Sequence, residues 1–145
     1  MIYKIEKLEK DIQNNSYDYI SKQSGVYRVL NLGNVPITIL GSSTNKKFDT
    51  YSVSDLQERY EKSKQNTILY IGKGDNLHKR IKQYIKFGLN LVDNHKGGRS
   101  IFQIEDYKKL YVEIILCDNC ECVEKNMLLG FEKQYNGLPM ANRKI

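Results

Sequence analysis

Glu132 and Arg80 are side chains whose types and positions could act on a phosphate group. Glu132 follows Leu128 by four residues, so in a helix its carboxylate borders an apolar stripe. A carboxylate there costs free energy unless it is paired or binds a metal ion. Arg80 stands at a similar border, three residues after Leu77, where a guanidinium can offer a planar fork to a phosphate. The plainer alternatives are a solvated boundary glutamate and a structural salt bridge.

Lys73, Tyr27 and Tyr70 accompany two short runs that are rich in β-forming residues. Lys73 lies in the turn directly after the run 67–72, where a ligand can approach the backbone and the side chain together. The alternative for this residue is an exposed loop lysine. Tyr27 and Tyr70 each lie two positions from a glycine. Tyrosines in short strands are more often core residues with a satisfied hydroxyl than catalysts.

The basic charge of the chain is concentrated in one segment. Lys and Arg total 23 against 17 Asp and Glu, which leaves a formal net charge of +6. Between residues 73 and 99 the only acids are Asp75 and Asp93, whereas seven residues are basic: Lys73, Lys79, Arg80, Lys82, Lys86, Lys96 and Arg99. A basic stripe is the electrostatic footprint of a polyanionic partner, so this distribution indicates nucleic acid.

The three cysteines lie close together, at Cys117, Cys120 and Cys122. An odd number in one short stretch is a poor disulfide framework and is typical of a reducing cytosol. A tetrahedral zinc site would need a distant ligand such as His78 or His95, because no second cysteine pair exists. Free thiols are therefore favoured over a zinc site, which is kept as an alternative.

A scaffold of short strands and amphipathic helices must position these side chains. The 145 residues fit one mixed α/β domain. No apolar run approaches the roughly 18 residues that span a bilayer, and the charged N-terminal segment is not a secretory signal, so we expect a cytoplasmic protein with no membrane contact. The patterns predict helices over 3–13, 54–64, 75–87 and 119–135, strands over 25–30, 67–72 and 111–116, a possible edge strand over 35–40, and an exposed loop over 41–47.

The order of the motifs resembles the GIY-YIG nuclease family. The residues that follow this order are Gly25-Val26-Tyr27, Tyr70-Ile71-Gly72, Lys73, Arg80, Glu132 and Asn142. Segment 70–84, YIGKGDNLHKRIKQY, is similar to the matching segment of the N-terminal nuclease of the bacterial excision-repair incision protein. Segment 128–135, LLGFEKQY, resembles the glutamate-bearing helix of the family, and 139–142 its Pro-x-x-Asn ending. Tyr27 and Tyr70 are farther apart than in compact members, so residues 31–66 are predicted to be an insertion.

The resemblance implies a fold of the α/β (α+β) class. We expect a small, mainly antiparallel, three-stranded central sheet flanked by helices, with the insertion 31–66 between the first two strands. The whole chain, 1–145, would form a single GIY-YIG-like nuclease domain. Its expected activity is metal-dependent endonucleolytic hydrolysis of phosphodiester bonds in DNA.

The resemblance also implies a role for each motif residue. Glu132 would bind Mg²⁺ (or Mn²⁺), and Tyr27 would help to activate the attacking water. Tyr70 would hydrogen-bond the reacting phosphate or the nucleophile. Arg80 and Lys73 would stabilise charge on the phosphoryl oxygens, and Tyr84 and Asn142 would orient their neighbours. The residues expected to hold the remaining DNA backbone are Lys73, Lys79, Lys82, Lys86, Lys96 and Arg99.

Two other functions compete with this prediction. The first is a nucleic-acid-binding module that has the same fold but does not cut, and it predicts salt-sensitive binding without product. The second is a zinc-stabilised interaction domain built on the three cysteines.

Overall fold

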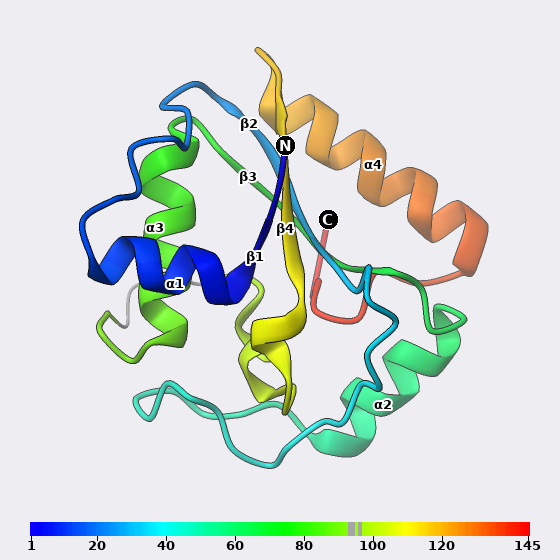
Figure 1. Ribbon diagram of the computed structural model, residues 1–145. Coiled ribbons are helices and arrows are strands. Elements are labelled where there is room, and N and C mark those ends of the chain that lie inside the picture. The colour runs from blue at the N-terminus through cyan, green and yellow to red at the C-terminus, as the bar shows by residue number, and fades with distance from the viewer. Residues whose placement is uncertain (93–94, 96) are drawn as a thin grey trace.

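The computed structural model describes residues 1–92, 95 and 97–145, and in these residues an antiparallel sheet lies between helices (Figure 1). The strands are β1 (Ile2–Lys4), β2 (Gly25–Leu30), β3 (Ile68–Gly74) and β4 (Tyr111–Leu116). The α-helices are α1 (Ile5–Gln13), α2 (Val53–Lys62), α3 (Leu77–Gly88) and α4 (Cys120–Tyr135), with short 3-10 helices at Arg99–Gln103 and Tyr107–Lys109. The predicted α+β class is confirmed.

The prediction of three strands is wrong, because the sheet of the described residues has four, in the order β1-β4-β2-β3. The additional strand is β1, which pairs antiparallel with β4 and places Ile2 opposite Glu113. A strand of three residues is too short to show the alternation of apolar and polar residues that marks a strand. The helical spacing of apolar residues that begins at Ile5 also masks it in the sequence.

The two faces of the sheet bury different clusters. Val26 and Ile71 pack with Leu128 of α4 on one face. Tyr27 and Tyr70, each displaced by one residue along its strand, join the larger core with α1 and α3 on the other face. Strand β3 is an edge of the sheet, and both α3 and α4 contact it. This edge is where the candidate site forms.

Parts of the insertion 31–66 belong to the core. The segment 41–47 is a mostly exposed loop, as expected, but Ser43 and Asn45 within it are buried. Asn45 is buried, and its Nδ2 donates hydrogen bonds to the carbonyl oxygens of Phe87 at 3.0 Å and Val92 at 2.9 Å. Leu56 of α2 is fully buried. The possible strand over 35–40 is reduced to one isolated bridge between Ile39 and Ile104.

Helix α2 begins slightly before its predicted start, and α3 begins slightly after its predicted cap. The side chain of Ser52 caps α2 by accepting from the Asp55 N–H, and Asn76 caps α3 by accepting from the Lys79 N–H. The sequence predicts a helix start at Ser54, two residues after the observed cap of α2, and a cap at Asp75, one residue before that of α3. Among the described residues, no helix combines the length and the apolar character needed to cross a membrane.

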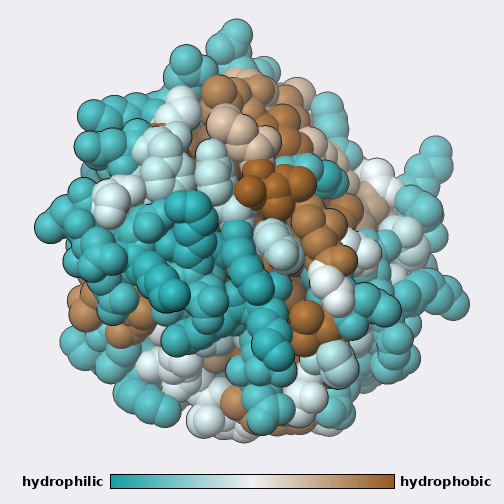
Figure 2. Space-filling model, in the orientation of Figure 1, coloured by the Kyte–Doolittle hydropathy of each residue, from teal (hydrophilic) through white to brown (hydrophobic). Residues whose placement is uncertain are grey.

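Polar side chains cover most of the surface in view, and apolar ones gather at the end of β4 and the adjoining part of α4 (Figure 2). Leu116 at the end of β4 and Leu129 of α4 are both exposed. The candidate site lies in more polar surroundings.

Candidate active site

A cleft of about 380 Å³ opens at the outer edge of β3, where α3 and α4 begin. Tyr70 and Lys73 reach it from β3, Arg80 from α3, and Glu124 from the second turn of α4. The other lining residues are Gly74, Asp75, Cys120 and Glu121. The structure therefore brings three predicted residues together, with a glutamate that we did not predict.

Three buried tyrosines pack together beside this site, and of these only Tyr70 lines the cleft. The ring centroids of Tyr27, Tyr70 and Tyr84 are each 5.9 Å from the other two. Burial raises the pKa of all three hydroxyls, so they stay protonated at neutral pH. Tyr84 donates a hydrogen bond to the carbonyl oxygen of Gly98 at 2.8 Å.

The Tyr27 hydroxyl is buried and makes no hydrogen bond of normal geometry with the described residues. Burial raises its pKa, and the nearby Arg80 and the Tyr70 hydroxyl partly oppose that rise. A buried polar atom without a partner costs free energy comparable to a lost hydrogen bond. Tyr27 therefore keeps unused hydrogen-bonding capacity next to Tyr70 and Arg80, but it does not itself line the cleft.

Glycines allow the tyrosines to pack this closely. Gly72 lies opposite Tyr27 across the β2–β3 pair, and a Cβ there would lie 2.6 Å from Tyr27 Cζ and 2.8 Å from Tyr70 Cε2. Gly98 has a φ of +68°, in the left-handed region, and a Cβ there would lie 2.9 Å from the Tyr84 hydroxyl oxygen. Larger residues at 72 or 98 would displace the tyrosines.

Glu124 is the half-buried acid of the cleft. Burial raises the pKa of its carboxyl group, and the positive charges of Lys73 and Arg80 partly oppose that rise. Within the part of the chain that the structure describes, this carboxylate makes neither a hydrogen bond nor an ion pair. Lys73 instead pairs with the exposed Glu121 at 3.5 Å. Glu124 is thus a desolvated carboxylate without a direct partner, which suits a cation ligand.

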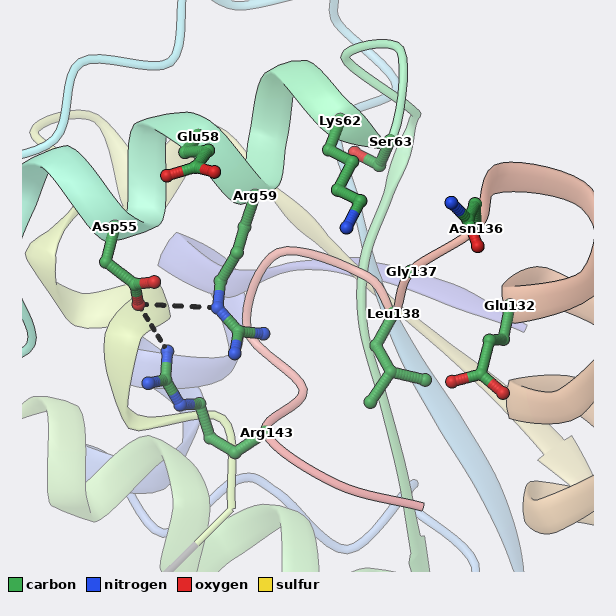
Figure 3. Close-up of a pocket in the computed structure, with 10 residues that line it drawn as sticks. All are labelled: Asp55, Glu58, Arg59, Lys62, Ser63, Glu132, Asn136, Gly137, Leu138 and Arg143. Carbon is green, nitrogen blue, oxygen red and sulfur yellow. Dashed lines mark hydrogen bonds and ion pairs between the residues drawn. The ribbon is translucent and has the colours of Figure 1, made fainter.

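Glu132, the predicted metal ligand, lies elsewhere. It is eight residues farther along α4, which corresponds to about 12 Å along the helix axis. Its side chain is exposed and lines another pocket of about 380 Å³, together with Arg59 and Lys62 of α2 (Figure 3). The structure does not bring Glu132 together with Tyr70 and Arg80.

The sequence contains a signal that could have found Glu124. It precedes Leu128 by four residues, just as Glu132 follows Leu128 by four, so both acids border the same apolar stripe. The segment LLGFEKQY directed the prediction to Glu132. The periodicity alone does not favour either acid.

Asn142 is buried against β3. Its Nδ2 donates to the Ile71 carbonyl oxygen, and its Oδ1 accepts from the Ile71 N–H, both at 2.9 Å. Arg59 of the insertion in turn donates from Nη1 to the Asn142 carbonyl oxygen at 3.0 Å. These bonds fix the C-terminal segment beside the residue that follows Tyr70.

Most of the predicted DNA-binding lysines and arginines do not share a surface with Arg80. Lys79, Lys82 and Lys86 follow one another at intervals of three and four residues, so they form a separate stripe of α3. Arg99 donates from Nε to the His95 carbonyl oxygen at 2.6 Å, and its guanidinium packs over the Phe48 and Phe87 rings. Of the predicted set, only Lys73 lines the cleft, and Lys96 lies outside the described residues.

The cysteines and histidines form no metal cluster in the described residues. Cys120 Sγ lies 3.7 Å from Asp75 Oδ1, Cys117 is half-buried and Cys122 is exposed. His95 packs against Tyr84, and burial lowers its pKa to about 3, so its ring is neutral. The zinc alternative gains no ligand set from this part of the chain.

Comparison with protein-family models, with curated proteins and with solved structures found no match to this chain. The similarity to GIY-YIG nucleases rests on the motifs of the sequence. The function must be argued from the site.

Proposed function

We propose that this chain is a metal-dependent endonuclease of the GIY-YIG type that hydrolyses phosphodiester bonds in DNA. The observation that carries the proposal is the single cleft shared by Tyr70, Lys73, Arg80 and Glu124. Phosphodiester hydrolysis needs cationic donors for the phosphoryl oxygens, hydrogen-bonding groups that orient the reactants, and stabilisation of developing negative charge. This cleft offers side chains for each need.

The side chains of the cleft fit a hydrated Mg²⁺ or Mn²⁺ ion, with Glu124 proposed as the ligand in place of Glu132. Mg²⁺ keeps several waters and is usually bound by one or two carboxylates and by substrate phosphates. Glu124 supplies one carboxylate that is not engaged by any described residue. When bound, such an ion supplies Lewis-acid stabilisation of the phosphate and lowers the pKa of a water molecule.

The residues of the chain would share the remaining work. Arg80 would donate hydrogen bonds to the phosphoryl oxygens, with the Lys73 ammonium as a second positive charge. Tyr70, which lines the cleft, would orient the attacking water or a phosphate oxygen, and the buried Tyr27 would help to position Tyr70 and Arg80. The raised pKa of both tyrosines disfavours a phenolate base at neutral pH, because burial opposes the charged form.

One observation favours a binding module without catalysis as a second candidate. The described residues contain no group of three potential metal ligands, so Glu124 would hold the cation almost alone. Lys73 is also engaged by Glu121. A module of this kind would bind DNA in a salt-dependent manner and would release no product with any divalent ion.

Cleavage assays separate the two candidates. Duplex, single-stranded and branched DNA are incubated with the protein in millimolar Mg²⁺ or Mn²⁺ and, separately, in excess EDTA. The nuclease requires metal-dependent product, and Arg80→Ala should reduce the cleavage rate by about 100-fold or more, as for other transition-state charge donors. Lys79→Ala is the matched control, since Lys79 is exposed on another side of α3, and it should cleave normally. Absence of product on every substrate would favour the binding module.

A further inference from the structure

The candidate active site continues into two more hollows along the surface. A neighbouring cleft of about 250 Å³ shares Tyr70 and Glu124 with the first and extends past Asn142 to Arg143 and Lys144. Arg143 also lines the pocket of about 380 Å³ formed with α2. The three hollows are thus neighbours, linked by shared lining residues, from the cleft at β3 to the insertion helix.

Unpaired cations lie along this continuation. Lys144 and Lys62 are exposed, and neither makes an ion pair or a hydrogen bond with any residue that the structure describes. The side chain of Lys62 extends into the pocket from α2 (Figure 3). A lysine ammonium held at a surface hollow without an acidic partner is available to a phosphate.

The two arginines of the same pocket share one carboxylate. Asp55 accepts from Arg143 at 3.0 Å and lies 3.3 Å from Arg59 Nε (Figure 3). The two guanidinium groups thus share the Asp55 carboxylate. The pocket also holds Lys62 and two further acids, Glu58 on α2 and Glu132 on the opposite wall, so three cationic and three acidic side chains line it.

We propose that the backbone of the DNA strand that enters the active cleft continues along this path, with phosphates held by Lys144, Arg143 and Lys62. The proposal rests on the proposed nuclease function and places the main binding contacts on the C-terminal segment and the insertion helix. The predicted lysine stripe of α3 is then a solvated face. Phosphate contacts of this kind position a strand without reading its sequence.

Two matched pairs of substitutions test the path. The path pair is Lys62→Ala with Lys144→Ala, and the control pair is Lys79→Ala with Lys86→Ala. Both pairs remove two lysine charges from the surface, so they change the net charge equally. Binding of a fluorescent DNA duplex is measured by anisotropy at several salt concentrations, and cleavage is measured at saturating DNA with Mg²⁺.

The path pair should weaken binding and reduce the slope of log K against log salt by about 0.9 for each lost contact. The control pair should leave both that slope and the cleavage rate unchanged. Equal losses from the two pairs, or a larger loss from the control pair, would overturn the path.

The experiment distinguishes failure of the proposed strand path from failure of the proposed nuclease function. A wild-type protein that cleaves DNA without the expected contrast between pairs rejects the path alone. A protein that shows the contrast but gives no product with Mg²⁺ or Mn²⁺ retains the path and rejects the nuclease. A protein that does not bind DNA rejects both.

Discussion

Helix α4 carries one glutamate in each of two dissimilar surroundings. Glu124 is half-buried near the start of the helix, and its charge is felt by Lys73 and Arg80. Glu132 is exposed near the end of the helix and shares a pocket with Arg59. Both border the same apolar stripe, so the difference comes from the element that lies opposite each acid. Chemistry is set by what the fold places across from a residue, and helical periodicity does not contain that information.

The largest expected effect separates the two acids directly. Glu124→Gln removes the proposed ligand charge while nearly preserving shape, so the cleavage rate should fall by several orders of magnitude. Glu132→Gln, the matched control on the same helix, should cleave at nearly the wild-type rate. Single-turnover rates with saturating Mg²⁺ measure both. Loss of cleavage in the Glu132 variant alone would restore the assignment made from the motif and reject the one made from the cleft.

The pH dependence of stability sharpens the same comparison. The folded-state pKa of Glu124 is raised, mainly by burial, so folding favours the protonated acid. Its contribution is present at low pH and is lost as pH rises from the ordinary value of 4.5 through the raised pKa. At neutral pH and without metal, Glu124→Gln should therefore melt at the wild-type temperature or higher. The stability advantage of the variant should shrink toward acidic pH, and melting curves from pH 4 to 8 measure it. A variant that gains stability over the wild type as pH falls would contradict the prediction.

Substitution of Asn142 tests whether the hydrogen bonds between the C-terminal segment and β3 stabilise the fold beside the site. Asn142→Ala leaves the N–H and the carbonyl of Ile71 without their side-chain partners. Two buried unsatisfied groups should cost about 2–4 kcal/mol of unfolding free energy. Denaturant titration measures the loss, and Lys144→Ala, two positions away and exposed, is the control that should unfold normally. Equal stability of both variants would mean that these bonds are dispensable.

The insertion offers a parallel test on the other side of the molecule. Asn45→Ala removes two hydrogen bonds to carbonyl groups, one at the end of α3 (Phe87) and one in the segment that follows it (Val92), which should cost about 1–3 kcal/mol. Ser42→Ala, at an exposed position in the same segment, should cost little. Urea unfolding midpoints compare the two. Equal midpoints would support the loop interpretation that the sequence suggested, and a gap would support a structural role.

The sequence predicts the strongly patterned elements well. The expected strands over 25–30 and 111–116 coincide with β2 and β4, and the last helix begins within a residue of α4. Long apolar or amphipathic runs repeat their apolar residues often enough to identify the element. Strand β1 has only three residues, and Asn45 is a polar residue in a polar segment, so neither carries a pattern.

The candidate site could be predicted only in part, for a related reason. Tyr70, Lys73 and Arg80 lie within one short segment of the chain, and a strand, a turn and a helix bring them together locally. Glu124 reaches them only through the packing of α4 beside β3, which depends on contacts distant in the sequence. The clustered lysines likewise show how much positive charge the segment carries. They do not show which surface carries it, because neighbouring positions on a helix point to different sides.

The smallest expected effect concerns Glu132 as part of the proposed strand path. Its carboxylate faces the pocket that holds Arg59 and Lys62, so it should repel a phosphate bound there. Glu132→Gln should tighten DNA binding by a few-fold at low salt, because an exposed charge contributes at most about 1 kcal/mol, and the gain should fade as salt screens it. Glu6→Gln, an exposed acid in the first turn of α1, changes the net charge equally and is the control. Anisotropy titrations at two salt concentrations compare the variants. An equal gain in both would reflect net charge alone, whereas a gain confined to Glu132 would place the strand beside the end of α4.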